Sequence, residues 1–207
     1  MTDLLPAHSV KVCRGASHCP HAVLGHDLIV ELETVLAGSG WPGFLAATTS
    51  PIRHHHQFRV AVASCPNGSS QPHIADFGLI ACARIGLDPE KCSGCGCCAA
   101  VCAENAVHLT GGLRLDRAVC LGCAKCARVC PEKALTIDEK AYRMLLGGKL
   151  GRRPRLAHEL GLFSLPAALH VLDKTLRVYM KHHRPGLRLG ELIESMGRER
   201  FDDLVRP

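Results

Sequence analysis

A cysteine pattern that occurs twice constrains this 207-residue chain more than any other feature. Residues 92–109 read CSGCGCCAAVCAENAVHL, and residues 120–137 read CLGCAKCARVCPEKALTI. Both copies contain the spacing C-x2-C-x2-C-x3-C, and Pro131 follows the second copy. Runs of this kind hold two [4Fe–4S] clusters, and the fourth cysteine of each run binds the cluster of the other run. The segment is therefore expected to be a two-cluster ferredoxin that transfers electrons.

The crossed arrangement divides the eight cysteines into two sets. The first cluster is expected on Cys92, Cys95, Cys98 and Cys130, and the second on Cys102, Cys120, Cys123 and Cys126. Zinc also binds paired C-x2-C motifs and is the alternative metal, but the duplicated order favours iron and sulfur. Ala103 departs from the pattern by replacing a proline. Cys97 lies outside it and is expected to be a small buried residue rather than a substitute ligand.

Composition and the start of the chain restrict the cellular setting. The chain has 13 cysteines, and its first residues, MTDLLPAHSVKV, lack the features of a secretory signal. Clustered cysteines without such a signal are typical of metal ligands in a reducing cytoplasm, here an anaerobic one, rather than of disulfides. No apolar run is long enough to cross a membrane, so no membrane insertion is expected. The net charge is +6, but only 4% of residues are aromatic, which argues against nucleic-acid binding.

The segments that flank the repeat have the periodicities of helices and strands. Before the repeat, apolar residues at Leu28, Leu32, Val35 and Leu36 predict a helix with Asp27 as its N-cap. Two strands are then expected, at QFRVAVAS (57–64) and IADFGLIA (74–81). After the repeat, the sequence predicts a strand that runs into a glycine turn and two amphipathic helices, at residues 142–151, 165–183 and 187–197.

This order predicts an α+β fold in which a ferredoxin interrupts a sheet domain. The sheet domain is expected to comprise residues 1–83 and 139–207, and the ferredoxin insert residues 84–138. The chain length is suited to one domain that carries such an insertion.

Several stretches together resemble a known family, the sirohaem nitrite and sulfite reductases. They are the C-x5-C of Cys13 and Cys19, HHQFRVAVASCPNG, PHIADFGLI, the ferredoxin repeat, YRMLLGGKLGRRPRLAHEL and the tail GLRLGELIESMGRERF. The sequence is most similar to the sirohaem subunit of anaerobic and dissimilatory sulfite reductases, in which a ferredoxin interrupts this half-domain. The resemblance implies the same fold, a third [4Fe–4S] cluster and a possible sirohaem site.

The resemblance also implies ligands for the third cluster. In the family, C-x5-C and a later C-x3-C bind this cluster, and the last cysteine bridges it to the sirohaem iron. Cys13, Cys19 and Cys65 match three of these positions, but Ser69 stands at the fourth. A serine alkoxide is a harder ligand than a thiolate and suits such a site less well. Ser69 or Cys82 is the possible fourth ligand, although Cys82 is more simply a buried apolar residue.

Cationic residues are the remaining candidates for ligand or partner binding. The family binds sulfite with lysines that alternate on the strand before C-x3-C, and here Arg59 and the preceding His56 are the candidates for anion binding. A basic run follows the repeat, with six basic and no acidic residues between Lys140 and His158. Its members are expected to meet sirohaem carboxylates or an acidic patch of a partner, with a solvated basic face as the alternative; they are Lys149, Arg152, Arg153 and Arg155.

The expected function is that of an iron–sulfur protein that carries electrons within or to a reductase. It would act with a redox partner protein or subunit, in a homo- or hetero-oligomer. One alternative is a small sirohaem-dependent sulfite or nitrite reductase with altered ligation, and another is a non-catalytic scaffold or sensor subunit. Ser69, the single charge on the 57–63 strand and the missing homologous N-terminal half argue against stable sirohaem binding by the isolated chain.

Overall fold

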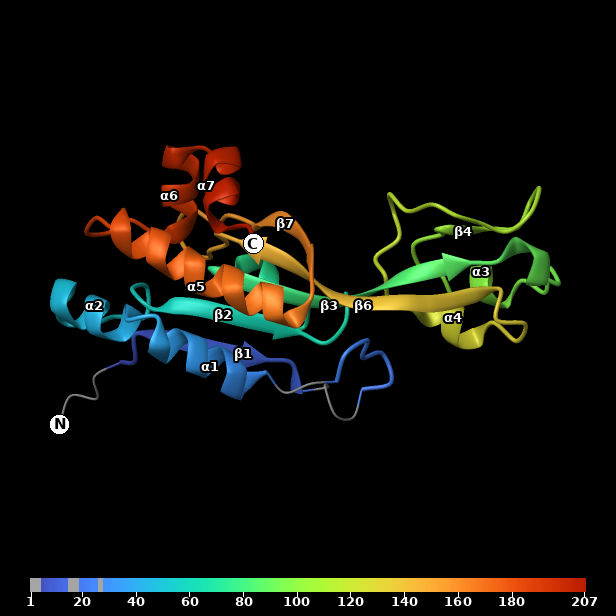
Figure 1. Cartoon of the computed structure of the whole chain (residues 1–207), viewed down its shortest axis with the longest axis horizontal. Helices are drawn as coiled ribbons and strands as arrows, with labels where there is room; N and C mark the ends of the chain where they lie inside the picture. Colours follow the sequence, from blue (N-terminus) through green and yellow to red (C-terminus); the bar gives the residue numbers. More distant parts are fainter. Residues whose placement is uncertain (1–4, 15–18, 26–27) are drawn as a thin grey trace.

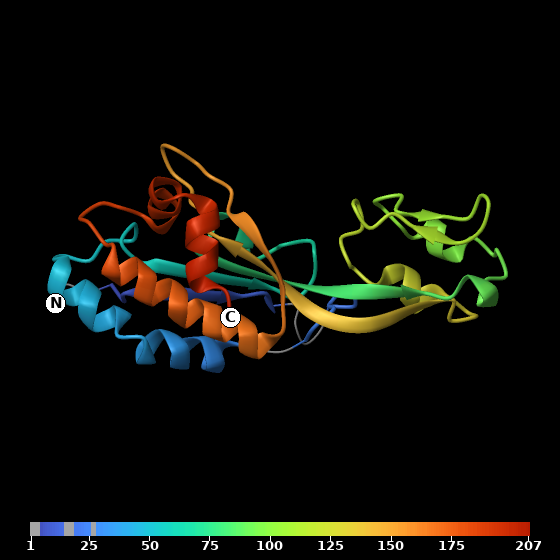
Figure 2. The same cartoon turned by 45° about the horizontal axis from the view of Figure 1, so that its top comes forward.

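The computed structural model describes residues 5–14, 19–25 and 28–207. These residues form an elongated molecule with a helix-covered sheet at one end and a smaller lobe at the other (Figure 1). Two long strands, β3 (Phe77–Leu87) and β6 (Leu135–Leu146), join the two parts as a continuous ribbon. Figure 2 shows the lobe suspended from the far end of this ribbon.

The main sheet has five strands in the order β1-β2-β3-β6-β7. The strands β1 (His8–Val12) and β2 (Phe58–Ala63) run parallel to each other and to β3. The strand β6 pairs antiparallel with β3, and β7 (His158–Phe163) pairs antiparallel with β6. Because β1 and β2 are parallel neighbours, the residues that follow each of them emerge at the same edge of the sheet.

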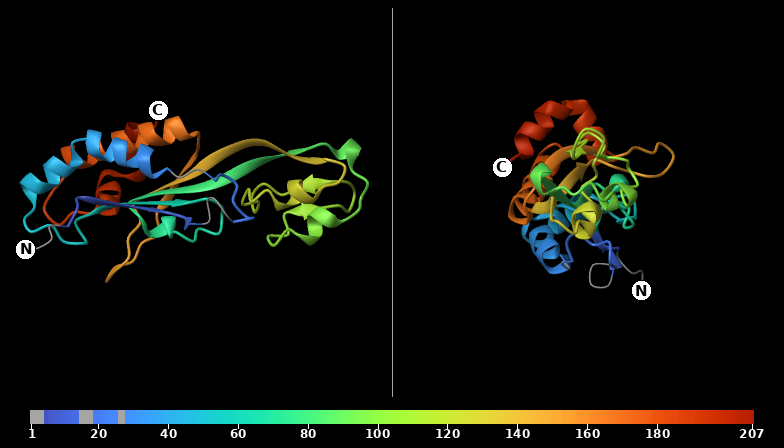
Figure 3. Two further views of the ribbon diagram at one scale, coloured as in Figure 1. Left: turned by 90° about the horizontal axis from the view of Figure 1, so that it is seen from below. Right: turned by 90° about the vertical axis from the view of Figure 1, so that its right-hand side faces the viewer.

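Three helices cover one face of this sheet, namely α1 (Ile29–Gly38), α2 (Trp41–Thr48) and α5 (Leu165–Lys181) (Figure 3). Trp41 is fully buried between them and stacks on Tyr179 with ring centroids 5.2 Å apart. Its indole N–H also donates a 2.9 Å hydrogen bond to the Ala7 carbonyl. Burial of large side chains of this kind stabilises a fold by about 1.5–3 kcal/mol each. The helical layer therefore anchors β1 and β2.

The other face of the sheet carries loops rather than helices. The short 3-10 helix η2 (Pro72–Ile74) packs over β3, and a hairpin at residues 147–157 projects from the end of β6. The C-terminal helices α6 (Leu189–Met196) and α7 (Arg198–Val205) pack near this hairpin. Figure 3 shows that the lobe hangs on this same side of the ribbon, opposite the helical layer.

The lobe contains both copies of the cysteine repeat. Its elements are short and follow one another as η3 (Pro89–Lys91), α3 (Cys97–Ala100), β4 (Val107–His108), β5 (Arg114–Leu115) and α4 (Lys125–Val129). Gly122 touches the main ribbon closely, since an added Cβ would lie 2.6 Å from the Ala83 carbonyl oxygen, and its φ of +73° suits glycine. Its carbonyl accepts a hydrogen bond from Ala83 N–H.

The observed elements agree with the sequence predictions in kind and differ in extent. The helix predicted after Asp27 is α1, and Asp27 itself lies outside the described residues. The predicted strands at 74–81 and 142–151 are β3 and β6, and both run well into the cysteine lobe. The boundaries predicted at residues 84 and 138 therefore fall inside continuous strands. In the described part of the chain, no helix is both long and apolar enough to span a membrane.

Candidate metal centres

The first predicted cysteine set surrounds one pocket of the lobe. Cys92, Cys95, Cys98 and Cys130 all line it, together with Leu109, Leu113 and Leu135. Three of the cysteines come from the first repeat, and Cys130 comes from the end of the second. The lobe thus brings together the residues that the crossed pattern assigned to one cluster, around a largely apolar hollow.

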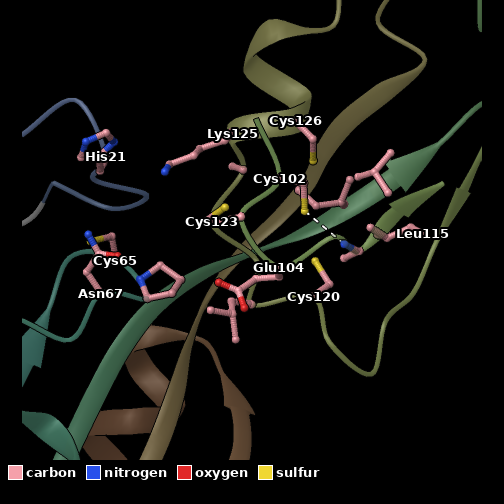
Figure 4. A pocket seen from close by; sticks show the side chains of 17 residues that line it. His21, Cys65, Asn67, Cys102, Glu104, Leu115, Cys120, Cys123, Lys125 and Cys126 are labelled. Carbon is pink, nitrogen blue, oxygen red and sulfur yellow. Dashed lines mark hydrogen bonds between the residues drawn. The ribbon is translucent and has the colours of Figure 1, made fainter. Parts of the chain in front are cut away.

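The second predicted set surrounds a neighbouring pocket, drawn in Figure 4. Its cysteines from the repeats are Cys102 of the first copy and Cys120, Cys123 and Cys126 of the second. In Figure 4 these sulfur atoms lie around the pocket, and a dashed line joins Cys102 to a backbone nitrogen. This contact is the hydrogen bond that Ala106 N–H donates to Cys102 Sγ at 3.3 Å. Backbone N–H groups aimed at ligand sulfur stabilise the negative charge that an iron–sulfur cluster carries.

Several thiols of the two pockets are partly withdrawn from solvent, although Cys95 is exposed. Burial raises the pKa of the Cys126 thiol to about 11, and nearby Cys120, Cys123 and Cys102 act in the same direction. Burial also raises the pKa of Cys98. Both shifts disfavour a bare thiolate, and a metal cation that replaces the proton removes this cost. The donor set is therefore suited to a cationic metal centre.

The spacing within each set distinguishes a cluster from a single ion. A zinc site requires sulfur atoms about 2.3 Å from one ion, and hence within roughly 4 Å of one another. Among the residues that the structure describes, no three cysteine, histidine or acidic side chains converge in this way. In a [4Fe–4S] cluster each sulfur binds a different iron atom, so the four ligands stand further apart. The all-cysteine donor sets of the two pockets suit iron–sulfur clusters.

Cys97 does not occupy the position expected for it. The sequence predicted a small buried residue, whereas the structure places Cys97 on the surface of α3. Its backbone N–H, and then its thiol, lower the pKa of the neighbouring Cys95 thiol through hydrogen bonds. The expectation of burial was wrong because α3 begins at Cys97, and the first turn of this short helix faces solvent on that side.

The cysteines predicted for a third site belong to segments near the sheet edge where β1 and β2 end. Cys13 follows β1 and donates its N–H to the Val62 carbonyl at 2.9 Å. The chain returns to the same strand at Val23, whose N–H bonds to the Ser64 carbonyl at 2.7 Å. Cys19 lies in the loop between these two anchors, and Cys65 directly follows Ser64. The parallel pairing of β1 with β2 thus brings Cys13 and Cys65 to one edge, and Cys19 belongs to the loop that returns there.

Ser69 belongs to this group of residues. Its hydroxyl lies 3.2 Å from Cys13 Sγ, at hydrogen-bonding distance. Cys82, the other candidate for the fourth ligand, lines a different hollow beside Cys120, and its thiol contacts the Ala141 carbonyl at 3.6 Å. Burial raises the pKa of Cys82. Ser69 is therefore the better placed of the two for a site that includes Cys13.

The sheet edge and the second cysteine pocket touch each other. Cys65 lines the pocket of Cys102, Cys120, Cys123 and Cys126, and Figure 4 shows it beside His21 at one end of that pocket. One side chain of the lobe makes two hydrogen bonds to the loop at residues 19–25. The Arg128 guanidinium, on α4, donates to the Pro20 carbonyl at 2.9 Å and to the Ala22 carbonyl at 2.6 Å. We refer to this contact as the Arg128 clamp.

The two residues predicted to bind an anion lie near the beginning of β2, whereas Cys65 follows its end. A six-residue strand spans roughly 20 Å, so His56, which precedes the strand, is remote from the sheet edge. His56 lines a hollow with His55, His183 and Arg188. Burial, followed by neighbouring positive groups, lowers the pKa of His56.

Arg59 lies on the helix-free face of β2, where Asp76 engages it. The Arg59 N–H donates to an Asp76 carboxylate oxygen at 3.0 Å, and the Arg59 Nε lies 3.8 Å from the same oxygen. Arg188 donates to both oxygens of this carboxylate. In the structure, the Arg59 Nε is buried and has no hydrogen-bond partner, so the guanidinium retains a donor.

Lys11 is a cation at this edge that the sequence analysis did not identify. It pairs with Ala61 in the parallel β1–β2 register, so its side chain projects from the same face as Arg59. Its ammonium group reaches Gln71 Oε1 at 3.3 Å, and it lies two residues before Cys13. The alternating pattern of HSVKV could have predicted which face of the strand Lys11 occupies. Only the pairing of β1 with β2 shows that Arg59 lies on the same face.

The basic run after the repeat divides into paired and unpaired residues. Lys149 forms an ion pair with Glu191, and Arg155 forms one with Glu194, both on α6. Two of the four cations that were predicted to meet sirohaem carboxylates or a partner are therefore paired with acidic side chains of this chain. Arg152 and Arg153 lie exposed at the tip of the 147–157 hairpin, between Leu150 and Leu156, which are also exposed.

Comparison with known proteins identifies the fold and the family. Residues 7–207 match the model of the nitrite and sulphite reductase 4Fe-4S domain. The chain is 36% identical over 154 residues to the coenzyme F420-dependent sulfite reductase of Methanocaldococcus jannaschii, covering 73% of this chain and 25% of that protein. It is 31% identical over 52 residues to one of the subunits of the anaerobic sulfite reductase of Salmonella typhimurium, covering 25% of this chain and 15% of that protein.

Two solved structures share the fold. Dissimilatory sulfite reductase I aligns with a TM-score of 0.64 and 20% identity, over 95% of this chain and 51% of that one. The NirA protein of Mycobacterium tuberculosis aligns with a TM-score of 0.50 and 16% identity, over 95% of this chain and 26% of that one. The chain spans about a quarter or less of the curated relatives and about half of the dissimilatory enzyme. On the match over residues 7–207, the chain belongs to the nitrite and sulphite reductase 4Fe-4S domain family.

Proposed function

We propose that this chain carries electrons for a reductase of its family through clusters held in the cysteine lobe and at the sheet edge. Residues 84–138 would form a ferredoxin insert, and residues 1–83 and 139–207 the half-domain that carries it. The observation that supports this proposal most is the division of eight cysteines between two pockets, each completed by a cysteine from the other repeat. When bound, [4Fe–4S] clusters supply one-electron transfer at low potential.

The residues of the chain would hold and insulate these centres. Leu109, Leu113 and Leu135 line the first pocket and keep water from it. The Ala106 N–H supports the second through Cys102. Contact of Cys65 with the second pocket supports an order in which the first pocket is remote from the sheet edge and the second is adjacent to it.

A third cluster is proposed on Cys13, Cys19 and Cys65, with Ser69 as the fourth ligand. The 3.2 Å contact between Cys13 Sγ and Ser69 Oγ supports this set. Cys82 is the less favoured fourth ligand because it lines the hollow beside Cys120. Ser69 is exposed, so its oxygen would leave this site accessible to solvent, whereas Cys98 and Cys126 of the lobe pockets are buried.

Iron analysis of anaerobically purified protein tests the proposal. About twelve irons per chain are expected with three clusters and about eight with two. Reduction by dithionite should give interacting S = 1/2 signals in electron paramagnetic resonance. The Cys130→Ala variant should damage the cluster of Cys92, and the Cys13→Ala, Cys19→Ala double variant should lose about four irons. Stoichiometric zinc with little iron would disprove the electron-carrier proposal.

A second candidate function is sulfite or nitrite reduction by a sirohaem bound at the sheet edge. Lys11 favours it, because together with Arg59 it provides two cations on one face of β1 and β2, near Cys13. Arg152 and Arg153 are exposed and could contact the carboxylates of sirohaem. The match to a protein named as a sulfite reductase agrees with this candidate.

Pigment extraction distinguishes the two candidates. Acidic acetone should release sirohaem, seen by absorption and fluorescence, only if the chain binds it. Stoichiometric pigment and reduction of sulfite or nitrite by a viologen donor would favour the reductase. An extract without pigment, from protein with intact iron–sulfur absorption, would favour the electron carrier.

The proposed setting is a multi-subunit redox assembly in a reducing, anaerobic cytoplasm. One relative is named as a subunit, which supports a partner protein or a second copy of this chain. The division of the eight repeat cysteines between two pockets suits metal ligands rather than disulfide pairs, and such ligands persist in a reducing compartment.

A further inference from the structure

A hollow lined by three arginines lies beside the second cysteine pocket, on the helix-free side of the ribbon. Arg84, Arg117 and Arg143 line it, and its cavity volume is about 490 Å³. The floor comes from β3 and β6, one wall from the segment at residues 117–122, and the opposite wall from Leu162 of β7. We call this feature the arginine hollow.

The strand register explains why these side chains gather on one face. Arg143 of β6 pairs with Ile80 of β3 and with Leu162 of β7, so all three project from the same side of the sheet. Ile80 belongs to the small apolar cluster with Ala63 and Leu145, which lies on the face without helices. Along β3, the alternate residues Cys82 and Arg84 project to this face as well.

The positive charge of the hollow is only loosely compensated. The Arg143 Nε lies 3.3 Å from a Glu159 oxygen, yet it is buried and makes no hydrogen bond in the structure. The Arg84 Nε lies 3.9 Å from Glu139, and both of these side chains are more than half exposed. Arg117 donates one hydrogen bond, at 3.1 Å, to the Ile85 carbonyl. Three guanidinium groups therefore face the hollow with donors available for an acidic ligand.

The hollow also touches a proposed cluster ligand. Cys120 lines both the arginine hollow and the second cysteine pocket. Leu162, which is 49% exposed, also lines the hollow and adds an apolar surface beside the arginines. Arginine is enriched at protein interfaces, and complementary charge guides the encounter of transient partners.

We propose that the arginine hollow is the docking site of an acidic one-electron carrier protein. A carboxylate of the partner enters the hollow between Arg84, Arg117 and Arg143, next to the exposed side chain of Leu162. The pocket of Cys120 would hold the cluster that accepts one electron, and the partner's cofactor would be oxidised by that same electron, with no covalent bond formed or broken. The inference rests on the proposed function, and it specifies which protein surface receives the electrons.

Binding of flavodoxin, an acidic flavoprotein, tests the proposal. Calorimetric titration at low salt should give a dissociation constant that rises steeply with ionic strength. The Arg84→Gln, Arg117→Gln double variant should weaken binding roughly tenfold or more, because each side chain loses a charge pair with the partner. Both residues are exposed, so the fold should survive. The control is Arg114→Gln, an exposed arginine of the same lobe outside the hollow, which should bind as the parent does.

The outcomes separate docking from the alternatives. Equal affinity of parent and double variant would overturn the docking proposal. Loss of inorganic phosphate binding in the variant, with flavodoxin binding unchanged, would instead identify a small-anion site and would also overturn it. Iron content and electron paramagnetic resonance of the same samples test the proposed function separately. Intact clusters with unchanged flavodoxin binding refute only the docking site, whereas absent clusters refute the electron-carrier function whatever the affinity.

Discussion

The cysteine lobe and the sheet-edge site achieve ligand convergence in different ways. In the lobe, each pocket collects its four cysteines from residues 92–130, a single stretch of short turns and helices. At the sheet edge, Cys13 and Cys65 come from segments that follow two different strands, and they meet because those strands are parallel neighbours. The lobe pockets depend on the spacing of cysteines along the chain, and the sheet-edge site depends on the pairing of two strands.

This difference has a consequence for stability. The proposed lobe ligands lie within one short stretch of the chain, whereas Cys13 and Cys65 remain together only while β1 and β2 stay paired. The outer corner of the edge site is also exposed at Ser69, while Cys98 and Cys126 of the lobe are buried. We therefore expect the edge site to lose its metal first under any stress.

The largest expected effect concerns the crossing of the two repeats. The Cys102→Ala variant should lose about four irons, and the loss should disturb the cluster of Cys120 rather than that of Cys92. Cys102 belongs to the first repeat but lines the second pocket. The exposed Cys97, changed to alanine, is the matched control and should keep the full iron content. Loss of iron from the Cys92 pocket alone in Cys102→Ala would break the proposed division.

Removal of the buried Trp41 indole tests whether the sheet edge releases its iron before the lobe does. Trp41→Ala should cost about 3–5 kcal/mol of unfolding free energy, because it empties a fully buried site beneath β2. Guanidinium titration monitored by iron release should show the edge site emptying at a lower denaturant concentration than in the parent. Val119→Ala, on the lobe surface, should leave both transitions in place. If both kinds of site release iron together in Trp41→Ala, the edge site does not depend specifically on the sheet.

The Arg128 clamp connects the two regions, and its loss should have an intermediate effect. Arg128→Gln removes two hydrogen bonds from a charged donor to the Pro20 and Ala22 carbonyls. Contacts of this kind contribute on the order of 1–3 kcal/mol each, and less when exposed as here. Amide hydrogen exchange at residues 19–25 should accelerate, with the lobe amides unchanged. Arg114→Gln, which breaks a bond inside the lobe, should leave exchange at residues 19–25 as it is in the parent.

The smallest expected effect is at Ser69. A thiolate is a softer ligand for iron than a serine oxygen, so Ser69→Cys should slow chelator removal of the edge-site iron. Ser69→Ala should accelerate it modestly, by removing the hydroxyl next to Cys13. The measurement is the rate of iron transfer to a chelator under anaerobic conditions. No response to either change would place Ser69 outside the coordination sphere.

The two regions also differ in how far the sequence could predict them. The pocket membership of all eight lobe cysteines follows from short spacings, and the helices at α1 and α5 follow from their apolar periodicity. The family match over residues 7–207 confirms the recognition of a nitrite and sulfite reductase relative. The contact between Cys13 and Ser69 agrees with the proposed third ligand set, although only the resemblance had connected these residues.

Other features required the strand pairing and could not be read from spacing. Lys11 joins Arg59 on one face because β1 is parallel to β2, and no local pattern shows which strands are neighbours. Cys82 faces Arg143 and Cys120 because β3 continues past the sheet into the lobe. The exposure of Cys97 depends on where a short helix begins.

Because β3 and β6 form one continuous ribbon, the lobe could be removed without disturbing the helix-covered sheet. Leu87 and Leu135, the last residues of the ribbon, pair directly with each other across it. A two-residue Asn-Gly turn could therefore replace residues 88–134 and close the ribbon as an ordinary hairpin. The helix-covered sheet would keep its core, and the same joint could accept a lobe with a different number of clusters. If the lobe supplies electrons as proposed, that supply could be exchanged without redesign of the helix-covered sheet.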